Sequence, residues 1–510
     1  MANINDREKL VNLDESGLIS DIEGLTLTNE NVIKSDSLET GKNIKQMFYE
    51  SICENDCLSF IKAKAIDVNV VFSEPFVSMQ YLSWTPLHVA CKKGKEKLVE
   101  GLLALGADQR IQDKKGETAL HVACKYGSHG CVELLLNHDM DNLKDMQNKQ
   151  GLTPLCKALY RLETAFRGDS YYRTIDLLIE AGCDVNLCPA VTNMTPLHLV
   201  ADRWGSRVVV EKLIAAGADV NKVTVDSSPL MSALCRTRVD SGTVEALIAA
   251  GADVNYRNRS GKYVLHVAVA KSEDVCVEYL LSAGADPNLL DSDGCSPLWI
   301  AVSENNIKIT PMLLKAGGDV NFTSKEYNVS LLCKAAIIGN KKITQLLLNH
   351  NAEVDTMTTL GATALHYAID RGNFDIVTML LERNCDLTNY SLFSDMFNAQ
   401  NALQIALKKG DRKVIKLLLK MGFPIHMIGR EVLIESVKED ESLLAWMTVF
   451  LFEPPSLAQL ARVSVREMCG PSLIKVMETL IEDCCIPRAL ADAILMKDVL
   501  ADEHVEYGFY

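Results

Sequence analysis

Histidine and cysteine side chains are the residues of this sequence whose chemistry could serve catalysis or metal binding. Five histidines stand three residues after the start of a similar short segment: His88, His121, His198, His266 and His366. The segment is clearest at Thr85, where the sequence reads Thr-Pro-Leu-His. Because these histidines recur with the segment, we expect their imidazoles to hydrogen-bond within and between hairpins. No His/Asp/Ser or Cys/His grouping departs from that spacing, so the sequence predicts a protein that is not an enzyme.

The sixteen cysteines predict packed thiols and not a disulfide framework. Cys91 and Cys124 occupy positions where a short helix needs a small apolar side chain. The sequence contains no C-x-x-C pair, so the usual ligand spacing of a zinc site is missing. We therefore predict reduced thiols, no cofactor, and a location in the cytoplasm, with the nucleus as a second compartment.

A repeated unit of about 33 residues positions these side chains. A Thr or Ser at its start can cap the free amides of a first helix, and Pro suits the first helical position. A glycine such as Gly94 or Gly127 then allows the chain to turn back into a Leu-rich second helix. A second glycine, such as Gly106 or Gly217, ends that helix. Neither helix hides its apolar side alone, so stacked copies are expected to bury a shared core.

Residues 44–428 contain copies of this unit. Their start points lie near residues 47, 85, 118, 153, 195, 228, 263, 296, 330, 363 and 401. A Thr-Pro-Leu-His opening with this period resembles the ankyrin repeat. The resemblance implies an all-α solenoid of about ten to eleven ankyrin repeats, in which helix pairs alternate with short β-hairpin fingers. Two insertions, at residues 162–172 and 390–400, lengthen the period and are expected to be loops.

The segments outside the repeats have different compositions. Residues 1–43 are polar and aperiodic, which predicts a disordered lead. Residues 429–453 predict two helices that cap the last repeat through Leu444, Trp446, Phe450 and Phe452. Pro454 and Pro455 then stop any helix, and a separate unit is expected over residues 454–497, followed by a tail over 498–510.

The unit at residues 454–497 opens with a predicted amphipathic helix. Its apolar face carries residues at helical spacing: Leu457, Leu460, Ala461, Ser464 and Val465. The pattern Ser-Leu-x-x-x-Ala-Arg-x-x-Val-Arg after Pro-Pro resembles the first helix of a SOCS box, a small three-helix domain. Following ankyrin repeats, it resembles the family of ankyrin-repeat and SOCS-box proteins. In that family this helix binds elongin C, which is joined to elongin B.

A second part of the same unit resembles the cullin-binding segment of that family. Ile486 and Pro487 match its last two positions, whereas Cys484 and Cys485 stand where the family has Leu and Pro. The resemblance implies cullin-5 with a RING subunit, in a ubiquitin ligase whose substrate protein is chosen by the repeats. Two alternatives stay open at this point. The chain could be an ankyrin scaffold or inhibitor without a ligase, or an F-box-like adaptor that uses Skp1 and cullin-1.

The substrate groove is expected at side chains that precede the first glycine of each repeat. These candidates are Lys92, Lys93, Lys125, Tyr126, Arg203, Trp204, Asp370 and Arg371. Several are basic although the chain carries a net charge of −15, so the groove favours an acidic or phosphorylated segment. The overall charge argues against a nucleic-acid partner. No apolar run approaches membrane-spanning length, so no membrane partner is expected.

Overall fold

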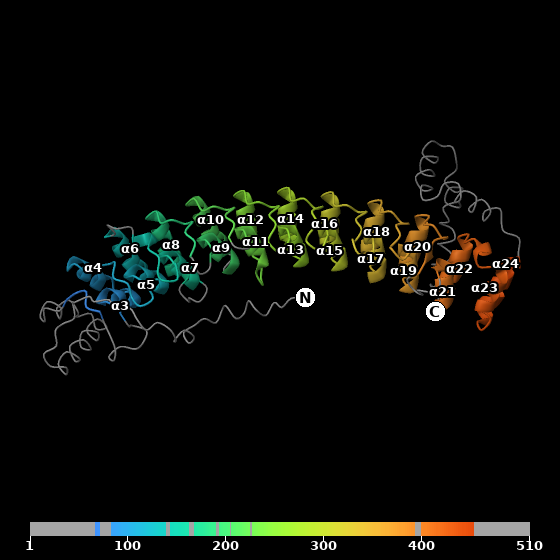
Figure 1. Ribbon diagram of the computed structural model, residues 1–510, viewed down its shortest axis with the longest axis horizontal. Coiled ribbons are helices and arrows are strands. Elements are labelled where there is room, and N and C mark those ends of the chain that lie inside the picture. The colour runs from blue at the N-terminus through green and yellow to red at the C-terminus, as the bar shows by residue number, and fades with distance from the viewer. Residues whose placement is uncertain are drawn as a thin grey trace.

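The computed structural model describes a curved stack of helix pairs. The described residues are 67–71, 83–138, 143–162, 168–189, 193–203, 206–224, 227–392 and 399–452. Figure 1 shows the first helices of the repeats along the concave side and the second helices along the convex side. The all-α solenoid predicted from the period is therefore confirmed. The expectations for residues 1–43, for most of the copy near residue 47, and for residues 454–510 concern residues outside the described ranges.

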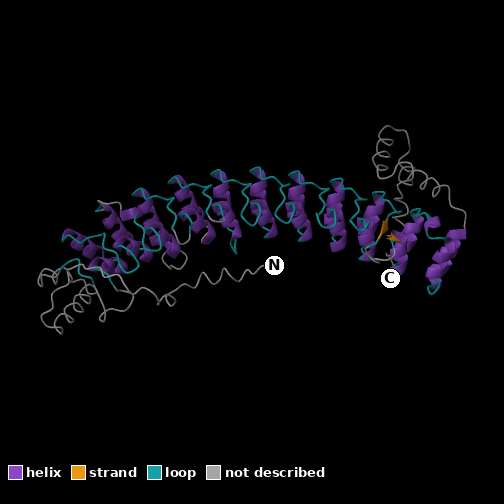
Figure 2. Cartoon of the chain, viewed as in Figure 1, coloured by secondary structure: helices purple, strands orange, loops and turns teal. Residues whose placement is uncertain are grey.

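Ten repeats between residues 85 and 420 each contribute two short helices in the described part of the chain. The first helices are α3 (Pro86–Lys93), α5 (Ala119–Tyr126), α7 (Pro154–Arg161), α9 (Pro196–Arg203), α11 (Pro229–Cys235), α13 (Val264–Ala270), α15 (Pro297–Ser303), α17 (Leu331–Ile338), α19 (Ala364–Asp370) and α21 (Ala402–Lys409). The second helices are α4 (Glu96–Ala104), α6 (His129–Asn137), α8 (Gly168–Glu180), α10 (Arg207–Ala215), α12 (Ser241–Ala249), α14 (Asp274–Ser282), α16 (Ile309–Lys315), α18 (Lys341–Asn349), α20 (Phe374–Glu382) and α22 (Arg412–Lys420). Loops join them along both sides of the stack (Figure 2).

The ends of these helices follow from the residues predicted there. The side chain of Thr118 accepts a hydrogen bond from the backbone amide of His121, and Ser228 does the same for Met231. Gly127 ends α5 in the left-handed conformation, with φ at 66°. These caps satisfy backbone groups that a helix of eight residues would otherwise leave open.

Most of the core is one continuous cluster of buried side chains that runs from Trp84 to Leu451, and a small second cluster contains Leu152, Cys156 and Leu199. Each first helix packs on the first helices of its two neighbours, as α5 does on α3 and α7. Fully buried leucines such as Leu102 and Leu135 contribute roughly 1.5–3 kcal/mol each by leaving water. Because each repeat contacts only its neighbours, these contacts determine the position of each repeat relative to the next.

A ladder of asparagine side chains joins successive hairpins. The backbone amide of Asp253 donates to Asn221 Oδ1 over 2.8 Å, and Asn221 Nδ2 donates to the carbonyl of Gly251 over 2.9 Å. Asn186 makes the corresponding two bonds one repeat earlier: it accepts from the backbone amide of Asp219 and donates to the carbonyl of Gly217. These bonds fix the spacing between repeats on the side where the hairpins lie.

The insertion between α20 and α21 contains a two-stranded hairpin. Strand β1 (Tyr390–Ser391) pairs antiparallel with β2 (Gln400–Asn401), and residues 393–398 between them lie outside the described ranges. The described residues also include two 3-10 helices, η4 (Leu143–Asp145) and η5 (Ile425–Met427).

The end cap consists of α23 (Arg430–Ser436) and α24 (Glu441–Phe452), as the sequence predicts, but its buried face differs from the prediction. Leu443, Met447 and Leu451 are the buried residues of α24. Leu444, Trp446 and Phe450 are only half-buried at the edge of the core, and the side chain of Phe452 is not described. The two rings of Trp446 and Phe450 stack on each other, with centroids 5.0 Å apart. Three of the predicted residues therefore pack at the edge of the core, whereas the fully buried stripe of α24 consists of Leu443, Met447 and Leu451 and begins one residue earlier.

Candidate functional site

The recurring histidines are buried and bridge neighbouring repeats. His121 Nδ1 lies 2.8 Å from the hydroxyl of Thr118, and His121 Nε2 lies 3.0 Å from the carbonyl oxygen of Leu152 in the next repeat. His88 makes the corresponding contacts with Thr85 and with the Glu117 carbonyl. Both ring nitrogens are thus engaged within the protein, which confirms the expected contacts within and between hairpins.

Burial changes the protonation of these rings. Burial lowers the pKa of His121 to about 4, although the hydrogen bond to Leu152 acts in the opposite direction. Burial likewise lowers the pKa of His366 to about 4 against the bond to Asn389. The imidazole rings are therefore neutral at pH 7. They are also buried, so a substrate in the solvent could not reach them.

The cysteines of the core have little nucleophilic character. Burial raises the pKa of the Cys91 and Cys124 thiols well above the ordinary value, and raises that of Cys183 to about 12. A thiol attacks as its thiolate, so these side chains are unreactive in the folded protein. Across the described ranges, no group of three or more His, Cys, Asp and Glu side chains is placed to hold a metal ion.

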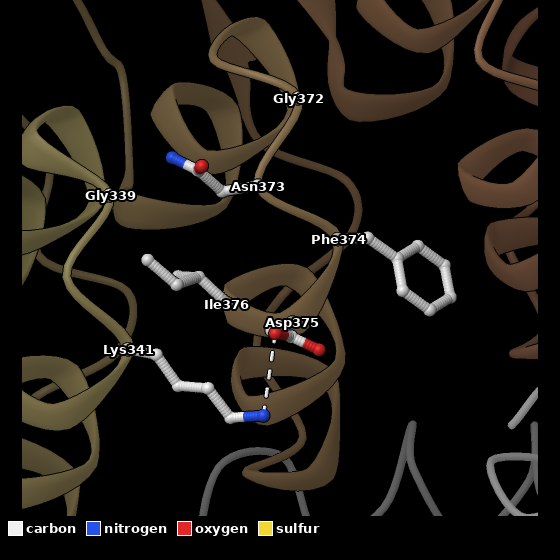
Figure 3. A pocket seen from close by; sticks show the side chains of 7 residues that line it. All are labelled: Gly339, Lys341, Gly372, Asn373, Phe374, Asp375 and Ile376. Carbon is white, nitrogen blue, oxygen red and sulfur yellow. Dashed lines mark ion pairs between the residues drawn. The ribbon is translucent and has the colours of Figure 1, made fainter.

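A polar recess lies at the turns between helices of two neighbouring repeats. Figure 3 shows its lining by Gly339, Lys341, Gly372, Asn373, Phe374, Asp375 and Ile376. Lys341 Nζ pairs with Asp375 Oδ2 across it at 3.3 Å. Asn373 Nδ2 donates to the carbonyl of Ala336, which ties one wall to the other. The two charged groups that line the recess are therefore paired with each other.

Four of the predicted groove residues lie together on the concave side, at the ends of α3 and α5. The ammonium of Lys92 lies 5.7 Å from the ring centroid of Trp84 and 5.2 Å from that of Tyr126. The ammonium of Lys125 lies 5.8 Å from the Tyr126 ring, whose residue is 39% exposed. Lys93 follows Lys92 at the end of α3 and is exposed. The structure therefore brings Lys92, Lys93, Lys125 and Tyr126 to one surface.

Arg203 extends this surface toward α9. Its guanidinium carbon lies 4.7 Å from the ring centroid of Tyr160, which belongs to α7. The backbone carbonyl of Arg203 accepts a hydrogen bond from Arg236 in the following repeat. Trp204 was predicted beside it, but residue 204 is outside the described ranges.

Asp370 and Arg371 lie five repeats further along the stack, at the end of α19 (Figure 1). Asp370 Oδ1 pairs with Lys409 Nζ of the next repeat at 2.9 Å. The structure therefore does not bring these two candidates together with Lys92, Lys125 and Arg203. They belong to a different part of the concave side.

Two aromatic residues next to this surface were not among the predicted candidates: Tyr160, which is half-buried, and Trp84, which is buried. Trp84 directly precedes the cap residue Thr85, and its ring nitrogen donates to Asp113 Oδ2 over 3.0 Å. Tyr160 occupies the last turn of α7. The position of Tyr160 within its repeat could have revealed it, whereas Trp84 lies just before the Thr-Pro-Leu-His opening, at a position that the repeat pattern does not specify.

The residues predicted to bind ligase subunits fall beyond residue 452, where the described part of the chain ends. They are Leu457, Leu460, Ala461, Ser464 and Val465 for elongin C, and Ile486 and Pro487 for a cullin. Their roles stay predictions from the sequence.

Comparison with protein families gives a match over most of the described solenoid. The family described as ankyrin repeats (3 copies) matches residues 87–186, 230–324 and 317–391, and the single ankyrin repeat matches residues 192–225. The ankyrin fold is typically a non-catalytic scaffold for protein–protein interaction. These matches end at residue 391, so they do not extend to the predicted ligase-binding unit.

Individual relatives share only parts of their length with this chain. Mouse Rabankyrin-5 is 29% identical over 167 residues, which are 28% of this chain and 14% of the relative. Putative ankyrin repeat protein FPV014 of fowlpox virus is 37% identical over 105 residues, 21% of this chain and 23% of the relative. Probable E3 ubiquitin-protein ligase XBOS33 of Oryza sativa subsp. japonica is 34% identical over 85 residues, 17% of this chain and 16% of the relative. The chain thus spans less than a quarter of each of these relatives.

None of the described helices combines the length and the apolar composition needed to cross a bilayer.

Proposed function

Because the chain belongs to the ankyrin-repeat family, whose repeats bind partner proteins, we propose that it is the substrate-recognition subunit of a ubiquitin ligase. Its repeats hold a target protein, and the segment around Leu457 docks on elongin C with elongin B. A cullin, cullin-5 by the resemblance, and a RING subunit then bring the charged ubiquitin-conjugating enzyme close to the target. The gain is in effective concentration, so the chain itself needs no catalytic residue.

The observation that carries the target-binding half is the surface of Lys92, Lys125, Tyr126 and Arg203 on the concave side. Rings that hold cations at 4.7–5.8 Å provide both charge and rigid apolar area, which are the features of interface hot spots. The solenoid presents this surface on short rigid helices, so little conformational freedom is lost when a partner binds.

The ligase half is supported by the sequence after Pro455 and by one relative. The helical spacing of Leu457, Leu460 and Val465 provides an apolar face for an adaptor. XBOS33, a probable E3 ubiquitin-protein ligase by its name, shares similarity with part of this chain. We therefore extend the proposal to ubiquitination, in a cytoplasmic or nuclear setting where thiols stay reduced.

The ligase half is tested by co-expressing the full chain with elongin B and elongin C and measuring their retention through purification. Burial of the Leu457 side chain supplies about 1.5–3 kcal/mol, so Leu457→Asp should weaken retention by about tenfold or more. Gln459→Asp places the same charge off the predicted apolar face and is the matched control, with retention expected to match wild type. Cullin-5 is then added to the retained complex, and cullin-1 serves as its comparison.

Other outcomes would identify the alternatives. Loss of elongin C from wild type and both variants would leave an ankyrin scaffold or inhibitor that binds its target without a ligase. Recovery of purified Skp1 with cullin-1, in place of elongin C, would show an F-box-like use of the segment at Ile486 and Pro487.

A further inference from the structure

A row of cations crosses six successive first helices on the concave side, from α3 to α13. We call this row the cationic strip; its members are Lys92, Lys125, Arg161, Arg203, Arg236 and Lys271. Four lie at the last or second-last residue of a first helix, whereas Arg236 and Lys271 directly follow α11 and α13. From residue 83 to residue 162 basic residues outnumber acidic ones, although the whole chain is strongly acidic.

Contacts between neighbouring repeats join these positions into one surface. Arg236 donates from its guanidinium to the carbonyl of Arg203, and Lys271 donates from its ammonium to the carbonyl of Arg236. Further toward the N-terminus, Tyr171 donates from its hydroxyl to the carbonyl of Lys125 over 2.9 Å. The positive charge of Arg161 acts to lower the pKa of both Lys125 and Tyr171. The strip is therefore continuous and not a set of isolated side chains.

Helix dipoles alone do not account for the strip. A cation near the C-terminus of a helix is favourable anywhere in the stack. Yet α15 ends at Ser303 and is followed by Glu304, and α17 ends at Ile338. These two repeats have the same backbone ends without a cation, so a helix end does not by itself require one. Cations return only at Arg371 after α19 and at the end of α21, where Lys409 pairs with Asp370. The unbroken row is therefore a feature of the repeats from α3 to α13.

The electrostatics of Lys125 favour an anion beside it. Burial lowers the pKa of Lys125, and the charges of Lys157, Arg161 and Lys115 lower it further, whereas Glu117 raises it. The Glu117 carboxylate is itself buried and already paired with Lys157. An added anion would relieve the repulsion among these cations and would gain from the low local dielectric.

We propose that the cationic strip binds an extended acidic segment of the target protein, with carboxylate or phosphate groups against Lys92, Lys125 and Arg203. This rests on the target-binding half of the proposed function and not on the ligase half. The rings of Trp84, Tyr126 and Tyr160 hold the cations in place, and the exposed ring of Tyr126 gives apolar contact between the charged positions. A nucleic acid is disfavoured because its dense charge would meet the acidic remainder of the chain.

The test uses the full chain and fluorescence anisotropy of labelled peptides of about 16 residues, at about 50 mM and about 200 mM salt. One peptide alternates Glu and Gly, a second replaces every Glu by Gln, and a third carries phosphoserine at some of the Glu positions. We expect the Glu peptide to bind more tightly than the Gln peptide and to lose affinity at the higher salt. Tighter binding of the phosphoserine peptide would also support the strip and identify phosphate as the preferred group.

Two variants locate the binding. Arg203→Glu should lower the affinity for the Glu peptide by about tenfold. Lys315→Glu makes the same charge change at the exposed end of the second helix α16 and should leave affinity within about twofold of wild type. Equal binding of the Glu and Gln peptides, or equal losses in the two variants, would overturn the proposal. Tighter binding of an oligouridine than of any peptide would overturn it as well.

The result is independent of the ligase assay. Peptide binding by a chain that fails to retain elongin C would reject the ligase half alone. Retention of elongin C by a chain that ignores the acidic charge would reject the cationic strip alone.

Discussion

The ring of Tyr263 packs against the imidazole of His266, with centroids 5.6 Å apart, and leaves His266 Nδ1 without a hydrogen-bond partner. In the matching position of another repeat, the hydroxyl of Thr363 lies 2.9 Å from Nδ1 of His366. The other ring nitrogen of His266 still reaches the next repeat, at 3.0 Å from the Cys295 carbonyl oxygen. One histidine of the series is therefore only half-satisfied, because tyrosine has replaced the capping threonine.

Tyr263→Thr should raise the free energy of unfolding by about 1 kcal/mol, through the restored cap and the bond to His266 Nδ1. Urea denaturation followed by circular dichroism measures it. Thr363→Ala is the reverse change at an intact cap and should lower the free energy by a similar amount. A loss of stability in Tyr263→Thr would mean that the ring contacts of Tyr263 with His266 and Arg257 outweigh the cap.

The buried histidines should make the solenoid sensitive to mild acid. An unfolded imidazole takes a proton near pH 6.5, whereas His121 and His366 resist protonation until about pH 4. The unfolded state therefore binds more protons in this window, and stability present above pH 6.5 falls as the pH drops toward 4. At pH 5 each of the two residues should account for a loss of about 2 kcal/mol.

Urea titrations at pH 7 and pH 5 measure this difference. His121→Gln removes the titrating ring, so the variant is less stable at pH 7 but should lose less between the two pH values. An unchanged difference in the variant would show that other groups produce the acid sensitivity.

Much of this arrangement follows from the sequence because each local signal agrees with its neighbours. Thr118 and Gly127 mark the ends of α5, and the repeat places them at matching positions elsewhere. The face of α24 could not be predicted in the same way. Its run from Leu443 to Phe452 is apolar nearly all round, so the pattern contains no contrast from which to select Leu443 and Met447 over Trp446.

The candidate surface could also be predicted only in part. Lys92 and Tyr126 could be predicted because the variable position before the glycine recurs in every repeat. Their mutual contact depends on how one first helix packs on the next, which a single repeat does not encode. Asp370 shares the same position in its repeat, but its distance along the stack and its pairing with Lys409 give it a different environment.

The asparagine ladder should stabilise the stack in proportion to the bonds each asparagine makes. Asn221 accepts from Asp253 and donates to Gly251, whereas Asn255 only accepts, from Asp286. Asn221→Ala should therefore cost about 1–2 kcal/mol, and Asn255→Ala about 1 kcal/mol less. Thermal and urea denaturation of the two variants provide the comparison. Equal losses would indicate that the donated bond to Gly251 contributes nothing measurable.

Gly127 should tolerate substitution less well than a glycine of the same conformation elsewhere. Gly127 and Gly410 end their first helices at φ of 66° and 67°. Alanine at either position pays for the left-handed backbone, about 1 kcal/mol. A Cβ at Gly127 would also come within 3.0 Å of the Tyr171 ring, whereas nothing lies within 4 Å at Gly410. The extra crowding should make Gly127→Ala about 1–2 kcal/mol worse than Gly410→Ala.

A double-mutant cycle identifies the cause of that difference. Tyr171→Ala removes the ring, so in this background Gly127→Ala should cost no more than Gly410→Ala, with an interaction energy of about 1–2 kcal/mol in urea denaturation. The hydroxyl of Tyr171 also holds the carbonyl of Lys125. Displacing the ring should therefore lower the affinity of Gly127→Ala for the acidic peptide, whereas Gly410→Ala should bind the peptide as tightly as wild type. Equal costs of the two glycine substitutions in both backgrounds would show that the Tyr171 ring moves aside freely and does not support Lys125.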